Sequence, residues 1–411
     1  MEVLHVVTGL GDGGAEAVLH RLCSHDRVTQ HVVVSLMDEA KYGPLLRAEG
    51  VAVHALGMRP GSVSLRGLLR LWQLMGQHRS ALVQTWMYHG DLVGGIVARL
   101  TGLRSIVWGV HHTTLERHAV KRRTRWVANA CALAANWVPA HIVCCAEEAK
   151  RVHAGMGYPP DRMSVVANGY DLSRFVPQSG GREALRSAWS VAAGKPLLGM
   201  VARFDPQKDH ANLIAALGHL SARGVGFRCV LVGPGVDPGN SALRDLLVRH
   251  GVSDRVVLVG ARDDIPAVMS ALDLHVLSSR YGEAFPNVLA EAMACGTPCV
   301  TTAVGDAGLI VGETGWVVPP ANPERLAVAI EQALEGLGDM PTWRARQADA
   351  RRRIEREFGV KRMVESYRRI WTATLREVED GRPRRRPCSV RLAWRARRAA
   401  RDAVPLRWRD R

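Results

Sequence analysis

Two glutamates eight positions apart carry the most informative chemistry in the chain. Glu283 precedes a predicted helix and Glu291 lies within it, because Pro286 suits a helix start and Gly296 a helix end. Glu291 stands among apolar residues, where a charge is costly unless a partner satisfies it. The pair could hold hydroxyl groups of an extended ligand whose phosphates meet the free N–H groups of the helix start. For either residue alone, helix-dipole stabilisation or a solvent-facing carboxylate is the simpler interpretation.

Two cations follow an earlier predicted strand at residues 196–201. Arg203 and Lys208 come directly after that strand and before a helix that Asp209 can cap. Ligands bind at the carboxyl edge of open parallel sheets, so both side chains are expected there. A planar guanidinium and an ammonium group suit a diphosphate, and a solvated surface pair is the alternative.

A glycine-rich loop near the N-terminus offers a second place for phosphate. Gly9, Gly11 and Gly14 follow a predicted strand at residues 3–8 and satisfy G-x-G-x-x-G, which lets backbone N–H groups approach an anion. The acidic pair at 38–39 keeps an NAD(P)-dependent oxidoreductase open as a second function. A tight turn without a ligand is a third interpretation, because such glycine patterns are weak alone.

Two series of short β-branched runs, separated by helix-length segments, position these groups. The runs lie at residues 3–8, 32–36, 81–85, 106–110 and 141–145, and then at 196–201, 229–232, 256–259, 274–278 and 299–302. This alternation predicts α/β architecture with a parallel sheet, repeated twice. Turn-forming residues around 168–171 and 177–181 predict a linker between the two units.

Composition indicates what kind of partner the chain binds and in which compartment it works. An excess of 55 Lys and Arg over 39 Asp and Glu gives a net charge of +16, which favours an anionic partner. The eight cysteines form no C-x-x-C pair, which indicates neither a disulfide framework nor a zinc site. The N-terminus enters a strand without the pattern of a signal peptide, so we expect a cytoplasmic location. Residues 126–146 lack charged side chains but contain Asn129, Asn136 and Pro139, and we interpret them as a buried helix followed by a strand.

In their order along the chain, these motifs resemble glycosyltransferase family 4, whose members have the GT-B fold of two Rossmann-like domains facing across a cleft. The matching elements are Gly11-Asp12-Gly13-Gly14-Ala15-Glu16, His111-His112-Thr113, Asn168-Gly169-Tyr170-Asp171, Arg203 with Lys208, and Glu283 with Glu291. They extend over about residues 1–375, and the two glutamates with the Arg/Lys loop are the specific part. The segments around His111 and Asn168 are most similar to bacterial O-antigen, capsular and exopolysaccharide transferases.

This resemblance implies a retaining, metal-independent hexosyltransferase without a cofactor. The donor would be a nucleotide sugar, with a UDP-sugar favoured over a GDP-sugar. The acceptor would be a hydroxyl of a saccharide or of a polyprenyl-diphosphate-linked saccharide in polysaccharide or lipopolysaccharide synthesis. A noncatalytic nucleotide-sugar-binding protein and a sugar-nucleotide epimerase of the same fold remain as alternatives.

The resemblance also assigns roles. Arg203 and Lys208 would neutralise the donor diphosphate, Glu291 would hold the ribose, and Glu283 would hold hydroxyls of the transferred sugar. His112 would reach the sugar near the reacting centre. The remaining candidates are Gly13, Gly14, Phe285, Asn287 and Val288 for donor binding, with His111 and Asn168 as secondary choices. Many members have Gly where this chain has Pro286, which has no N–H to donate.

The domain organisation that follows has four parts. We expect an acceptor-side domain at 1–175, a nucleotide-sugar-binding domain at 176–358, a helix at 359–380 packing back on the first domain, and a basic tail at 381–411. The tail has twelve arginines against two aspartates, a balance of 12 − 2 = +10, with Trp394 and Trp408 interspersed. We expect peripheral contact of this tail with an anionic membrane, helped by the basic cluster at 121–125, and no binding to nucleic acid. A solvated tail is the alternative.

Overall fold

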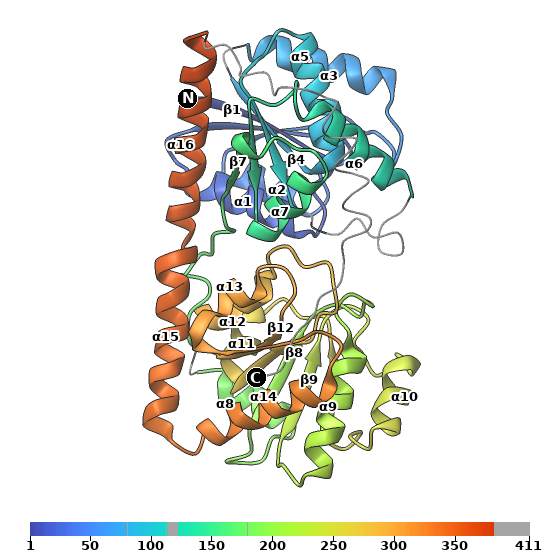
Figure 1. The fold of residues 1–411 in the computed structure, drawn as a ribbon, viewed down its shortest axis with the longest axis vertical. Helices are drawn as coiled ribbons and strands as arrows, with labels where there is room; N and C mark the ends of the chain where they lie inside the picture. Colours follow the sequence, from blue (N-terminus) through green and yellow to red (C-terminus); the bar gives the residue numbers. More distant parts are fainter. Residues whose placement is uncertain (80, 112, 114–121, 179, 382–411) are drawn as a thin grey trace.

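The structure is a computed structural model that describes residues 1–79, 81–111, 113, 122–178 and 180–381. Two lobes stand end to end, each with a parallel sheet covered by helices (Figure 1). Within the described residues the first sheet has seven strands in the order β3-β2-β1-β4-β5-β6-β7, and the second has six in the order β10-β9-β8-β11-β12-β13. The prediction of two α/β units with parallel sheets is confirmed.

The first lobe alternates strands and helices. Its strands are β1 (Glu2–Val7), β2 (Gln30–Ser35), β3 (Ala52–Ala55), β4 (Leu82–Trp86), β5 (Ile106–Val110), β6 (His141–Cys144) and β7 (Met163–Val165). Its helical segments are α1 (Gly14–His25), α2 (Tyr42–Ala48), α3 (Leu65–Gln77), α4 (Met87–His89), the π-helix η1 (Gly90–Gly94), α5 (Gly95–Leu100), α6 (Arg122–Ala134), α7 (Glu147–Gly155) and the 3₁₀ turn η2 (Pro160–Arg162).

The second lobe repeats the pattern. Its strands are β8 (Leu197–Val201), β9 (Arg228–Val232), β10 (Val256–Gly260), β11 (Leu274–Leu277), β12 (Cys299–Thr302) and β13 (Trp316–Val318). The helical segments are α8 (Arg182–Ala188), α9 (His210–Ala222), α10 (Ser241–Arg249), α11 (Ile265–Ala271), α12 (Asn287–Ala294), α13 (Ala307–Val311), the 3₁₀ turn η3 (Gly312–Thr314), α14 (Pro323–Gly336), α15 (Met340–Phe358) and α16 (Val360–Glu379). All ten predicted strands are present, and β3, β7 and β13 are additional.

Both faces of the first sheet are buried, which explains its nearly continuous apolar strands. In β1, Leu4 and Val6 face one core together with side chains of α3, α5 and α6. Val3 and Val7 face the other core, which contains side chains of α1 and α16. The helices therefore form two layers, one on each side of the sheet.

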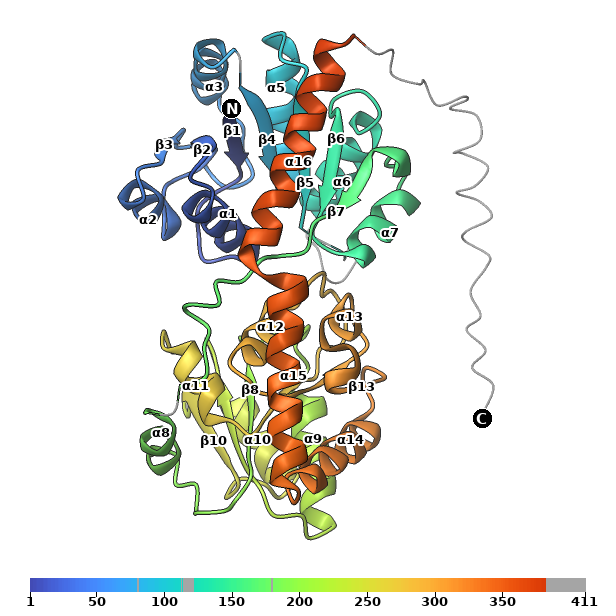
Figure 2. The ribbon, with the colours of Figure 1, turned by 90° about the vertical axis from the view of Figure 1, so that its left-hand side faces the viewer.

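The chain passes between the lobes twice, and the two crossings lie side by side. Tyr170 donates its N–H to the carbonyl of Phe358 at 2.9 Å, and Val360 donates to the carbonyl of Tyr170 at 3.0 Å. Beyond Gly359, α15 on the second lobe is followed by α16 on the first (Figure 2). The last helix thus ties the first lobe to the second a second time.

A buried carboxylate anchors α16. The Asp26 side chain is fully buried and accepts a hydrogen bond from Arg368 Nε at 2.8 Å, with His31 Nε2 3.5 Å away. Burial alone would raise the pKa of Asp26, but the hydrogen bonds from His31, Arg368 and Thr29 outweigh it and hold that pKa well below its usual value. The carboxylate is therefore charged in the folded chain at neutral pH.

Replacing Asp26 with Asn should lower the free energy of unfolding at pH 7 by about 3 kcal/mol, because Arg368 and His31 lose a buried anionic partner. The lowered pKa contributes stability above the unfolded-state pKa of about 4, and this stability is lost as pH falls through the folded-state pKa. Denaturant unfolding at pH 7 and pH 3 should show the difference between Asp26→Asn and the parent chain shrinking at the lower pH. Asp349→Asn, at an exposed pair with Arg352, should change stability by less than about 0.5 kcal/mol.

The interpretation of residues 126–146 is correct for the strand and wrong for a buried helix. Helix α6 buries Ala128 and Cys131, but Trp126 is 78% exposed, Leu133 67% and, just past its end, Trp137 71%. The segment lacks charge because an apolar surface faces outward, not because the helix is enclosed. Among the described residues, no helix combines the length and the apolar character needed to cross a bilayer.

Candidate active site between the lobes

Lys208 and Glu283 meet in a buried ion pair. The Lys208 Nζ donates to Glu283 Oε1, and the Ser279 hydroxyl donates to the same oxygen at 2.6 Å. The two side chains are only 13% and 8% exposed. Both lie in loops that follow strands of the second sheet, β8 for Lys208 and β11 for Glu283. The sequence therefore places opposite charges at one sheet edge although 75 positions separate them.

The loop that carries Lys208 is held in an unusual backbone conformation. Asp209 has a φ of 49°, in the left-handed region that non-glycine residues rarely adopt. Its side chain accepts from the N–H of Asn212 at 3.2 Å, which confirms the predicted cap of α9. The Ser278 hydroxyl lies within hydrogen-bond distance of the carbonyls of Lys208 and Asp209, at 3.0 and 2.9 Å. These contacts fix the direction in which Lys208 leaves the backbone.

Arg203 lies in the same loop, with its guanidinium 56% exposed. Its Nε is 3.3 Å from Asp205 Oδ2, and its Nη2 is 3.2 Å from Gln207 Oε1. These partners orient the guanidinium while leaving much of it open to solvent. It can therefore receive an anion without breaking a buried contact.

The Glu283 backbone touches the first lobe. Thr113 Oγ1 donates to the Glu283 carbonyl at 2.9 Å. Gly305, with a φ of +58°, lies so close that a Cβ there would sit 2.1 Å from the same carbonyl oxygen. His111, two residues before Thr113, stacks on Trp86 with ring centroids 5.1 Å apart. The other predicted histidine, His112, lies outside the described residues.

The start of α12 gathers a second group of predicted residues. Asn287 Oδ1 accepts from Asn168 Nδ2 at 2.9 Å and also from the Tyr170 hydroxyl. A Cβ on Gly14 would lie 3.3 Å from Asn287 Nδ2, so the glycine loop of the first lobe approaches the helix start of the second. Gly13 immediately precedes α1, and Val288 is half-buried in the first turn of α12. The structure thus brings Gly14, Asn168 and Asn287 together.

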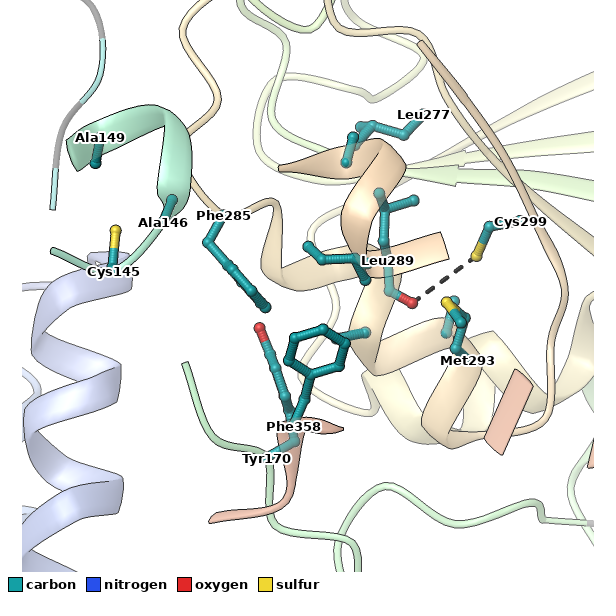
Figure 3. Close-up of a cluster of buried hydrophobic side chains, with 14 of the residues drawn as sticks. Cys145, Ala146, Ala149, Tyr170, Leu277, Phe285, Leu289, Met293, Cys299 and Phe358 are labelled. Carbon is teal, nitrogen blue, oxygen red and sulfur yellow. Dashed lines mark hydrogen bonds between the residues drawn. The ribbon is translucent and has the colours of Figure 1, made fainter. Parts of the chain in front are cut away.

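Phe285 lies in the packed interface between the lobes (Figure 3). Its ring is 6% exposed, and its centroid is 6.3 Å from that of Tyr170 and 5.4 Å from that of Phe358. Figure 3 shows Cys145 and Ala146 of the first lobe beside this cluster. A donor contact made by Phe285 would therefore run through its backbone.

Glu291 lies on α12 near cations from outside the second lobe. Burial raises the pKa of Glu291, and the neighbouring guanidinium groups of Arg21 and Arg174 oppose that rise. Arg21 belongs to α1, and its Cζ lies 4.8 Å from the centroid of the Tyr170 ring. Cations from α1 and from the connection between the lobes thus offset only part of the cost of this mid-helix charge.

Sequence reasoning missed some of the residues that act across the lobes, and Asp306 is the clearest. Its carboxylate accepts from the N–H groups of Glu147 at 2.8 Å and Glu148 at 3.0 Å, at the start of α7. Ala146, at the position before that helix, offers no side-chain cap. An uncapped helix start was the available signal, but nothing in the sequence identifies a capping group 159 residues away.

Replacing Asp306 with Ala should loosen the contact between the lobes. Loss of a helix cap costs about 1 kcal/mol, so we expect about fivefold faster amide hydrogen exchange in the first turn of α7. Asp339→Ala is the matched control, because Asp339 caps α15 within its own lobe through Thr342. If the amide hydrogens in the first turn of α7 exchange at the same rate in both variants, Asp306 does not stabilise the start of α7.

Three buried groups elsewhere could ligate a metal, but their two imidazole rings already contact each other, Trp86 and Asp26. His5, Cys23 and His31 offer ligand atoms within 4.8 Å of one another. His5 Nε2 and His31 Nδ1 are 2.9 Å apart, and Trp86 Nε1 donates to His5 Nδ1 at 3.1 Å. A metal would have to break this chain of hydrogen bonds.

Comparison with known proteins assigns both lobes to known families. The model described as Glycosyltransferase Family 4 matches residues 12–174, and the model described as Glycosyl transferases group 1 matches residues 195–336. The chain is 28% identical over 326 residues to the putative glycosyltransferase EpsF of Bacillus subtilis, covering 75% of this chain and 81% of EpsF.

The chain is also similar to a galactosyltransferase in sequence and to a crystal structure in fold. Over 257 residues the chain is 26% identical to the UDP-Gal:alpha-D-GlcNAc-diphosphoundecaprenol alpha-1,3-galactosyltransferase of Escherichia coli, covering 60% of this chain and 64% of that enzyme. The crystal structure of Anabaena HepE in complex with UDP superposes with a TM-score of 0.80 at 22% identity, over 91% of this chain and 100% of HepE. That likeness establishes the fold.

The match of both lobes excludes the oxidoreductase that the glycine loop had left open. In the structure, one of the acidic residues after β2, Glu39, is paired with Arg47. The chain belongs to glycosyltransferase family 4 and is a retaining GT-B enzyme that transfers a sugar from a nucleotide-sugar donor.

Proposed function

We propose that this enzyme moves a hexose from a UDP-sugar to a hydroxyl of a polyprenyl-diphosphate-linked saccharide during synthesis of a cell-surface polysaccharide. The observation that carries the proposal is the buried Lys208–Glu283 pair, which lies where the second sheet meets Thr113 of the first lobe. The names of two similar proteins support the substrates: HepE was crystallised with UDP, and the E. coli relative is named for UDP-galactose and a diphosphoundecaprenol-linked acceptor.

In this proposal the second lobe binds the donor. Arg203 and Lys208 neutralise the diphosphate, since one offers a planar fork and the other a point charge. Glu291 accepts hydrogen bonds from the ribose, and Glu283 accepts them from hydroxyls of the transferred sugar. The start of α12, at Asn287 and Val288, offers N–H groups and a positive dipole end to phosphate.

The chemistry follows from the charge that develops during transfer. The bond between the anomeric carbon and the phosphate oxygen breaks, which leaves an oxocarbenium-like sugar and a more negative diphosphate. Fixed cations aimed at that diphosphate stabilise the transition state more than the ground state. The acceptor oxygen attacks the same face, and its proton passes to the departing phosphate oxygen, so configuration is retained. His112 is proposed to contact the sugar near the anomeric carbon.

Nucleotide release tests this function directly. The enzyme should release UDP from a UDP-sugar only when a polyprenyl-diphosphate-linked saccharide is present, and the sugar should appear on the lipid. Donor binding without release would indicate a noncatalytic protein, and conversion of the donor without an acceptor would indicate an epimerase. Activity with GDP-sugars alone would contradict the proposed donor.

The basic tail is proposed to hold the enzyme on the cytoplasmic face of the membrane. Its twelve arginines attract anionic lipid, and Trp394 and Trp408 suit the interface. The full chain should sediment with phosphatidylglycerol vesicles more strongly than a chain ending at Gly381. Equal sedimentation of the full chain and the chain ending at Gly381 would show that the tail does not bind the membrane.

A further inference from the structure

The first lobe exposes apolar side chains on one of its two helical layers. Of the large hydrophobic residues that are more than one-third exposed among the described residues, many fall in α3, α5, α6 and their flanks. They are Val63, Leu65, Leu69, Trp72, Ile96, Leu100, Trp126, Leu133 and Trp137. We call the surface formed by segments 63–79, 95–105 and 122–137 the outer helical face.

The three helices belong to one continuous layer. Helices α3, α5 and α6 pack on the same side of the first sheet through Leu71, Val97 and Cys131. α3 contacts α5, and α6 contacts η1, which leads directly into α5. In Figure 1 the layer lies on the opposite side of the lobe from α16. The exposed residues are therefore neighbours on one face.

The charge on this face has a single sign. Segments 63–79, 95–105 and 122–137 contain no Asp or Glu. Their eight arginines are Arg66, Arg70, Arg79, Arg99, Arg104, Arg122, Arg123 and Arg125, and all but Arg99 and Arg125 are exposed. Arginine around exposed Leu and Trp is the composition of surfaces that lie in the headgroup region of an anionic bilayer.

We propose that the outer helical face docks on an anionic lipid bilayer, independently of the tail. Charge selects this occupant, because two copies of a face that carries only positive charge would repel each other. Exposed Leu and Ile indicate insertion among acyl chains, whereas a nucleic acid would leave them in contact with polar backbone.

The face reaches the edge of the lobe that borders the candidate site. β5 and β6 are parallel neighbours and α6 connects them, so α6 starts at the carboxyl edge of the sheet, where Thr113 contacts Glu283. A Cβ on Gly61, just before α3, would lie 3.6 Å from Arg123 Nη1, so the starts of α3 and α6 are adjacent there. Docking through this face would bring the membrane close to the site. That consequence rests on the proposed lipid-linked acceptor, whereas the docking itself does not.

The test compares two sets of surface substitutions in the full chain and in a chain ending at Gly381, which retains every described helix and strand. The first set is Trp72→Gln, Trp126→Gln and Leu133→Gln on the outer helical face. The matched control is Leu45→Gln, Val248→Gln and Leu309→Gln, on exposed helix positions of α2, α10 and α13. Sedimentation is measured with phosphatidylglycerol–phosphatidylcholine vesicles and with phosphatidylcholine alone.

We expect the chain ending at Gly381 to bind the anionic vesicles and not the neutral ones. The first set should weaken that binding about tenfold or more, and the control set should not. Both sets should keep the parent unfolding midpoint and the parent rate of transfer to a water-soluble acceptor analogue. This last measurement separates failed docking from failure of the proposed function.

Three results would overturn the proposal. One is equal vesicle binding by the first set and the control set. Another is equal binding to neutral and anionic vesicles. The third is a dimer, seen by light scattering, that the first set dissociates, because the face would then be covered by a second copy of the chain.

Discussion

Glu283→Gln should lower kcat/KM for sugar transfer by about 10²- to 10³-fold, as should Lys208→Met. Each variant removes one charge that we place at the donor. Each also leaves its partner buried without a counter-charge, because the side chains are only 13% and 8% exposed. We therefore expect each single variant to lose about 3–5 kcal/mol of unfolding free energy, measured with denaturant.

The double variant separates catalysis from folding. Lys208→Met combined with Glu283→Gln removes both charges and should regain much of the lost stability, since neither partner stays buried alone. Its rate of UDP release should stay as low as that of the less active single variant. If the double variant recovered transfer activity along with stability, the ion pair would be a structural feature and not part of the donor site.

Glu291→Ala should abolish the preference of the enzyme for a nucleotide that carries both ribose hydroxyls over one that lacks them. If the carboxylate accepts hydrogen bonds from both, the parent enzyme should bind UDP about 100-fold tighter than 2′,3′-dideoxy-UDP, as charged hydrogen bonds of about 1.5–3 kcal/mol imply. The variant should bind the two nucleotides with nearly equal affinity in calorimetric titration. The fall in UDP affinity should match the fall caused by removing the hydroxyls.

Glu313→Ala is the control for this experiment, because Glu313 is an exposed carboxylate elsewhere in the second lobe. It should keep the full 100-fold preference for UDP. A Glu291→Ala enzyme that still discriminates between the two nucleotides would show that another group holds the ribose.

Periodicity and turn residues predicted most of the fold. The ten predicted strands are apolar runs of four to six residues, and all but the edge strand β10 are largely buried in their sheets. The three unpredicted strands, β3, β7 and β13, are only three or four residues long and lie at sheet edges, where a partly exposed strand has a weak apolar signal. Helix α6 shows the opposite error, since an uncharged sequence suggested burial where the structure has an exposed apolar surface.

The candidate site was predictable where chemistry follows a strand end, and it was not predictable where it depends on side-chain directions or on contact between the lobes. Lys208 and Glu283 could be placed at one edge because both follow strands of the same sheet. Their direct pairing could not, since it depends on side-chain directions set by Ser278 and Ser279. The contact of Thr113 with Glu283 and the Asp306 cap of α7 join residues 170 and 159 positions apart, so only the packed lobes show them.

The proposed function requires that cations of the second lobe hold the diphosphate of one activated sugar. It is tested most directly by titrating a UDP-sugar into the parent chain, Arg203→Ala and Arg244→Ala, an exposed arginine of α10. Because Arg203 is 56% exposed, its loss should leave the fold intact. We predict that Arg203→Ala weakens binding by about 10- to 100-fold while Arg244→Ala binds like the parent. Parent-like binding by Arg203→Ala would show that Arg203 does not hold the diphosphate.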